Sequence, residues 1–134
     1  MLTLQDVFGY TNDQIISHIV STYETEIELV KIFDILIAYE SVGDYGCDSA
    51  SFFLLEERVT GDLYENHGSH CSCYGFEYQF KPEITTIEYL KSEKFSFTTG
   101  GYDDNVSENE LKVNKYIKNM IRKIHFEDQL FTIN

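Results

Sequence analysis

The chain of 134 residues contains no tryptophan, one proline and three cysteines. Because the proline is Pro82, no proline-rich linker divides the chain, and the sequence shows no internal repeat or low-complexity tract. We therefore expect a single domain over residues 1–134. Three cysteines cannot all pair within one chain, and thiols are normally kept reduced in the cytosol. We therefore do not expect a disulfide framework.

Long apolar runs are missing as well. No stretch reaches the roughly eighteen apolar residues of a membrane span, and the first residues, Met1–Asp6, lack the cationic region and cleavage site of a signal peptide. These absences predict a cytoplasmic protein. Ten tyrosines, ten phenylalanines and a hydrophobic fraction of 43% exclude a disordered acidic tail and predict a packed core.

Cations are scarce in the first 80 residues. Fourteen Asp and Glu stand there against two bases, Lys31 and Arg58, which gives a net charge of −12, whereas nine acids against eight bases give −1 for residues 81–134. Such a surface repels free nucleic acid and membranes, and it attracts basic partners. The simpler alternative is that the charge serves solubility alone.

Hydrophobic periodicity predicts the order of the elements. A helix is expected over residues 11–23, capped by Thr11, Asn12 or Asp13, and His18 on its polar side is expected to be solvated. The period of two over residues 26–42 predicts a strand, with a helical start left open. Further segments are expected as follows: a strand over 51–57, a hairpin turn over 58–62, a half-buried strand over 76–80, a short helix from a Thr85 and Glu88 capping box to about 93, and a short strand at 95–98.

The amphipathic pattern behind a capping box of Ser107 and Glu110 predicts the C-terminal helix, with a cationic second face. Together these elements predict an α+β fold. We expect an N-terminal helix, an antiparallel sheet of four or five strands, and the C-terminal amphipathic helix packed on the sheet.

Two imidazoles and two thiols lie within seven residues, and these are zinc-binding side chains. The candidate ligands are His67, His70, Cys71 and Cys73. Their spacing is more compressed than in the usual structural zinc sites, which take two short-spaced pairs of ligands separated by a longer loop. The structural alternative is that the cysteines are small buried hydrophobic residues and that Gly68, Ser69 and the histidines form a turn.

A third interpretation of the cluster is nucleophilic chemistry. Cys71 or Cys73 would pair with His67 or His70 and with an acid such as Asp48, which follows Cys47. No glycine-rich nucleophile elbow or electropositive neighbour is visible to lower the thiol pKa, and acidic surroundings raise it. The sequence therefore favours a protein without catalytic residues and without a cofactor, with zinc as the alternative.

The run Gly68–Glu77, followed by Pro82–Leu90, resembles a segment of small uncharacterised proteins encoded by phages and prophages. The similarity covers about thirty residues and transfers no functional residue. It implies a mobile-element origin, and hence the cytoplasm of an infected or lysogenic bacterium. By analogy with anti-CRISPR and anti-restriction inhibitors, the acidic surface would then imitate the phosphates of nucleic acid and occupy a basic groove.

The function predicted from these observations is a non-enzymatic inhibitor of a basic, nucleic-acid-handling host protein. It contacts neither free nucleic acid nor membrane. The carboxylates expected to bind the partner are Glu40, Asp44, Asp48, Glu56, Glu57, Asp62 and Glu65.

Overall fold

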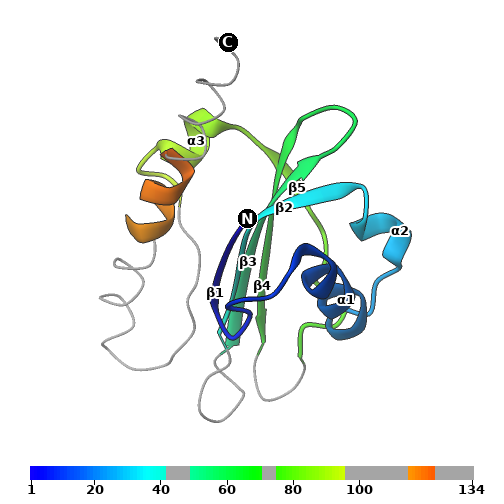
Figure 1. The fold of residues 1–134 in the computed structure, drawn as a ribbon. Helices are drawn as coiled ribbons and strands as arrows, with labels where there is room; N and C mark the ends of the chain where they lie inside the picture. Colours follow the sequence, from blue (N-terminus) through cyan, green and yellow to red (C-terminus); the bar gives the residue numbers. More distant parts are fainter. Residues whose placement is uncertain (42–48, 71–74, 96–114, 123–134) are drawn as a thin grey trace.

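The computed structural model describes residues 1–41, 49–70, 75–95 and 115–122 (Figure 1). One five-stranded sheet runs through them, and helices cover both of its faces. The strands follow the spatial order β1 (Leu2–Gln5), β2 (Phe33–Ser41), β3 (Ser49–Glu57), β4 (Leu63–His70) and β5 (Glu83–Thr85). The helices are α1 (Asn12–Thr22), α2 (Ile27–Val30) and α3 (Ile87–Lys91).

This architecture confirms the predicted α+β class with five strands. The sheet is mixed, so the expectation of a purely antiparallel sheet was wrong for one strand: β2 to β5 pair antiparallel, but β1 pairs parallel to β2, with Leu2 opposite Ile37. The physical reason lies in the connection. Helices α1 and α2 form a crossover between β1 and β2, and a crossover lets neighbouring strands run in the same direction.

Helix α1 forms where the sequence places it. Thr11 accepts a hydrogen bond from the backbone N–H of Gln14 at 3.2 Å, and the Gln14 side chain accepts from the backbone N–H of Thr11 at 2.8 Å. This reciprocal capping box satisfies donors that a helix start leaves open. Ile15, Ile16 and Ile19 are buried against the sheet, as their spacing predicts.

The ambiguous stretch 26–42 contains both structures that the sequence allowed. Its start is the single helical turn of α2, and β2 follows. The pairing register of β2 with β3 shifts between Ile35 and Ile37, so that Leu36 is an extra residue in a bulge. Because of this shift Ile35 and Ala38 belong to one core, and Ile37 and Tyr39 to the other. The bulge explains why the period of two is interrupted by additional apolar residues.

Both faces of the sheet are covered, so there are two cores. The first contains the apolar side of α1 together with Phe53 and Leu55 of β3. The second contains Phe52 and Leu54 of β3 against α3, Phe95 and the segment 115–122. Burial on both sides explains the continuous apolar run in β3, since its alternating side chains enter different cores.

Two local predictions were wrong. The alternation over residues 76–80 is not a strand: Phe76 is buried and Phe80 packs against the first core, but Tyr78 is 71% exposed and has a φ of 63°. The second error concerns the cap of α3. Thr86, not Thr85, accepts from the backbone N–H of Tyr89 at 3.1 Å, while Thr85 ends β5. The short helix itself is confirmed, ending at Lys91.

The described part of the predicted C-terminal helix is residues 115–122, which are helical. Ile117 and Ile121 are fully buried in the second core, as the apolar stripe predicts. The predicted capping box at Ser107 and Glu110 lies outside the described residues, and so does most of the expected strand over 95–98.

Candidate functional site

The carboxylates predicted to bind a partner do not form one surface. Glu40 of β2 is only 4% exposed, and its side chain points toward the first core. Its assignment to a partner surface was therefore wrong. The bulge before Glu40 shifts the alternation of β2, so the sequence alone did not reveal that this side chain points inward. Asp44 and Asp48 lie outside the described residues.

Glu56, Glu57 and Asp62 lie together at the hairpin between β3 and β4. Glu56 stands opposite Asp34 of β2, and the backbone N–H of Glu57 donates to the carbonyl of Asp62 at 2.9 Å. Asp62 is exposed, whereas Glu56 and Glu57 are half-buried. These three positions agree with an acidic rim at one end of the sheet. Glu65 lies further along β4, in a different environment.

The histidine and cysteine cluster begins inside a strand. His67 and His70 are both residues of β4, which means that the expected turn at Gly68 and Ser69 was wrong. Cys71 and Cys73 lie outside the described residues, as does Cys47. Within the described part of the chain, no group of three or more His, Cys, Asp or Glu side chains is placed to hold a metal ion. The zinc site therefore stays a prediction from sequence.

Residues 75–82 close the edge of β4 that β5 is too short to cover. Asn66, which is 1% exposed, donates to the carbonyl of Gln79 at 3.2 Å and accepts from the backbone N–H of Lys81 at 2.6 Å. The Gln79 side chain in turn accepts from the backbone N–H of Ser69 at 2.8 Å. Side chains thus take the place of a neighbouring strand, and an exposed edge is avoided.

A cavity of about 420 Å³ opens over the β4–β5 edge, on the face of the second core. Glu65 and His67 of β4 line it together with Glu83 of β5 and Tyr89 of α3. Glu65, His67 and Glu83 also line an adjoining cavity of about 280 Å³. This is the one place where residues of both predicted sets, the acidic set and the histidine cluster, meet in the described structure.

Hydrogen bonding fixes one of these carboxylates. Nε2 of His67 lies 2.9 Å from Oε1 of Glu65, whose side chain is 11% exposed. The ring of His67 packs on Phe52, with the centroids 5.1 Å apart. Glu83 stands directly opposite Glu65 in the register of β4 with β5. The sequence did not predict Glu83 as a site residue, because the short strand β5 was not expected.

A second polar group lies on the other face of the sheet and was also missed. Nε2 of His18 is 2.8 Å from Oε2 of the buried Glu40, and the hydroxyl of Tyr23 donates to the same oxygen at 3.3 Å. The bond to Glu40 raises the pKa of His18 above 6.5, against a smaller opposing effect of burial. Burial and the nearby Glu40 raise the pKa of Tyr23. His18 is therefore a bonded, half-buried residue and not the solvated one that its helix position predicted.

Helix α2 presents apolar side chains to the outside. Ile27 is 46% exposed, Leu29 is 56% exposed, and Ile32 just beyond the helix is 45% exposed. Of the exposed carboxylates here, Glu26 directly precedes Ile27 and Glu28 lies between Ile27 and Leu29. We call these five residues the α2 patch. Exposed aliphatic side chains and carboxylates close together in sequence are a composition that protein interfaces also have.

No known protein family, no curated protein and no solved structure matches the chain. None of the described helices is long and apolar enough to cross a membrane.

Proposed function

We propose that the protein is a non-enzymatic acidic binding protein of phage or mobile-element origin, acting in the cytoplasm of a bacterial host. Its partner is a basic host defence protein that handles nucleic acid. The protein inhibits this partner in the manner of anti-CRISPR or anti-restriction proteins, by offering carboxylates to cations that otherwise hold phosphates.

The α2 patch is the observation that carries the proposal. Three exposed aliphatic side chains, Ile27, Leu29 and Ile32, offer apolar area, and the carboxylates beside them select a cationic partner. A purely solubilising surface has no need of exposed aliphatic groups, since these lower solubility. Apolar contact and charge together are the composition of a protein interface.

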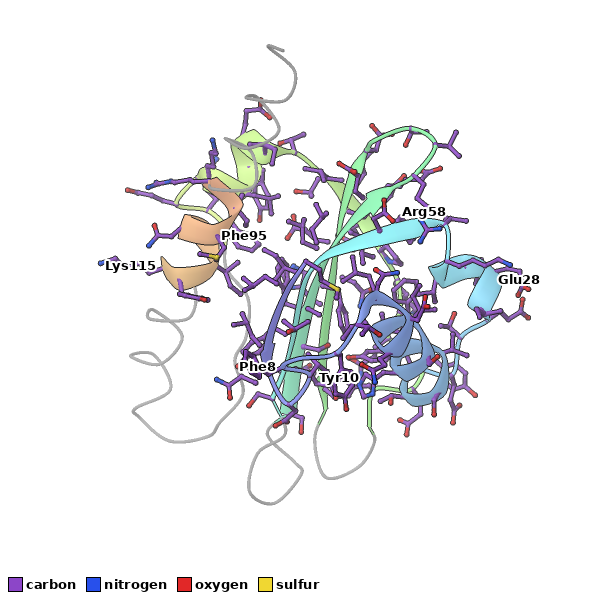
Figure 2. The ribbon with its side chains drawn as sticks, in the orientation of Figure 1. Phe8, Tyr10, Glu28, Arg58, Phe95 and Lys115 are labelled. Carbon is purple, nitrogen blue, oxygen red and sulfur yellow. The ribbon has the colours of Figure 1, made fainter. Side chains whose placement is uncertain are left out.

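The distribution of charge supports the same proposal. Residues 1–80 contain fourteen carboxylates and two cations: Arg58, which is bound to Asp34 at 2.9 Å, and the exposed Lys31, which lies between Leu29 and Ile32. Figure 2 shows Glu28 and Arg58 on one side of the sheet and Lys115 on the opposite side. The cations of the last helical segment therefore do not neutralise the α2 side, and a basic partner is steered toward it.

The test is capture of host proteins at low salt by the immobilised chain and by Glu26→Gln/Glu28→Gln. A genuine partner binds the unaltered chain, is released as salt rises toward 0.3 M or so, and is retained less by the variant. Double-stranded DNA, added as competitor, displaces the same partner. The matched control, Glu88→Gln/Glu93→Gln, removes two exposed carboxylates elsewhere and is expected to capture as much as the unaltered chain.

Binding that does not change with salt would contradict the proposal. So would a partner that holds nucleic acid and this protein at the same time without competition. The zinc alternative has its own test: a zinc module loses its fold with a chelator, whereas the acidic binder keeps it.

A further inference from the structure

The cavity over β4 and β5 contains a pair of facing carboxylates, only one of which has a partner among the described residues. Glu65 and Glu83 are direct cross-strand neighbours, and like charges in that position destabilise a sheet. Glu65 has His67 as a hydrogen-bond partner. Among the residues that the structure describes, the carboxylate of Glu83 has no hydrogen-bond or ion-pair partner.

The lysine that lines the adjoining cavity does not pair with these carboxylates. Lys81 lines the adjoining cavity, two residues before Glu83. Within the described part of the chain its ammonium group forms no ion pair with Glu65 or Glu83. Glu83 is thus the carboxylate of this pair that lacks a counter-charge among the described residues.

Two further residues of the cavity bear on what it can hold. Oγ1 of Thr85 is buried without a hydrogen-bond partner in the described structure, which is an unusual state for a buried hydroxyl. Tyr89, which is 42% exposed, provides an aromatic wall of the same cavity. An aromatic face attracts a cation placed over it.

We propose that this cavity binds the guanidinium group of an arginine side chain on the protein partner. The guanidinium is planar, carries five donors and stacks on aromatic rings, so it can meet Glu83, the second oxygen of Glu65 and the ring of Tyr89 together. A lysine ammonium is a point charge without this fork, and it fits the same set less well. The His67 bond holds Glu65 in position for the contact.

The inference rests on the proposed function for the source of the arginine. Failure of this inference can nevertheless be distinguished from failure of the proposed function, because binding in the cavity is measured with a small probe and without a partner protein. Probe binding without any salt-dependent protein partner would overturn the proposed function alone. A partner captured by the α2 patch, with no probe binding, would overturn this inference alone.

The probe is N-acetyl-L-arginine amide, titrated into the full chain and followed by NMR shifts of the His67 ring and the Tyr89 ring. N-acetyl-L-citrulline amide, its neutral isostere, is the control ligand, and N-acetyl-L-lysine amide is the second cation. We expect the arginine probe to bind about tenfold more tightly than citrulline, a difference of about 1.4 kcal/mol, and more tightly than lysine. This comparison uses the unaltered protein.

Variants locate the site. Glu83→Gln is expected to weaken the arginine probe about tenfold, because it removes one charge-assisted contact. Tyr89→Leu is expected to weaken it by a smaller factor, on the order of threefold, through lost stacking. Glu88→Gln, which changes charge equally beside the cavity without lining it, is expected to change binding less than twofold. Equal binding of arginine and citrulline, or an unchanged affinity in Glu83→Gln, overturns the proposal.

Discussion

The carboxylate of Glu40 is buried, and it accepts hydrogen bonds from two residues of the N-terminal helix region, His18 and Tyr23. A buried charge is stable only where hydrogen bonds and an opposite charge replace water. His18 and Tyr23 supply both, at 2.8 Å and 3.3 Å from one oxygen of Glu40. The bond between His18 and Glu40 joins α1 to β2 across the first core.

We predict that this pair makes stability fall as pH rises above neutral. The pKa of His18 is raised in the folded protein above the value of 6.5 that it has when unfolded. The folded state therefore binds the proton more tightly, so the stabilisation is fully present below pH 6.5 and is lost as pH rises through the folded pKa. We expect a loss of about 1.5 kcal/mol, the lower end of the range for a hydrogen bond to a charged group.

The measurement is urea unfolding from mildly acidic to mildly alkaline pH for the unaltered chain and for His18→Gln. Glutamine keeps a donor toward Glu40 but does not titrate, so the difference between the two proteins isolates this pair from the other histidines. A constant difference across that range would contradict the prediction.

At the scale of elements, the edge of β4 is closed by a segment that is not a strand. Residue 68 of β4 has to be small, because a Cβ added to Gly68 would meet Oγ of Ser51 in β3 at 2.5 Å and Cδ1 of Phe76 in this segment at 3.2 Å. Close packing thus explains why residue 68 is a glycine. The segment and the strand are one packed unit.

We predict that Gly68→Ala destabilises the fold by about 1 to 3 kcal/mol, the usual effect of overpacking. Ser51→Gly in the same chain removes the nearest clashing atom and is expected to restore part of the loss, which urea unfolding of the two single variants and the double variant would show.

Gly75→Ala is the matched control for this substitution. The Cβ added there would meet the carboxylate of Glu77 at 2.9 Å, which is the far end of an exposed, flexible side chain. We expect a change within about 0.5 kcal/mol. Equal losses in Gly68→Ala and Gly75→Ala would show that close packing at β4 is not the cause.

The elements that could be predicted are those specified by neighbours in sequence. Thr11 and Gln14 cap α1 within one turn, and the stripe that includes Ile117 and Ile121 predicts a packed helix. What could not be predicted depends on register. The bulge at Leu36 turns Glu40 inward, and the pairing of β5 with β4 places Glu83 opposite Glu65. Local patterns contain no information about either pairing, so the buried network and the cavity were both missed.

At the scale of the whole molecule, charge is divided unequally along the sequence. The net charge of −13 lies almost entirely in residues 1–80, and Lys115 of the last helical segment lies on the side opposite Glu28 (Figure 2). Self-repulsion among carboxylates lowers the stability of a compact state. An acidic surface used for binding therefore works against folding stability at low salt.

This opposition gives a prediction that separates a binding surface from a merely solubilising one. At low salt, Glu26→Gln/Glu28→Gln is expected to raise stability by a few tenths of a kcal/mol up to about 1 kcal/mol, because it relieves repulsion, and to weaken partner binding at the same time. Thermal unfolding at low and moderate salt measures the first effect, and the gain is expected to shrink as salt screens the charges.

The control Glu88→Gln/Glu93→Gln, in the chain region whose net charge is near zero, is expected to gain less stability and to keep partner binding. If the α2 variant gained stability without any loss of binding, the carboxylates of the patch would serve solubility alone.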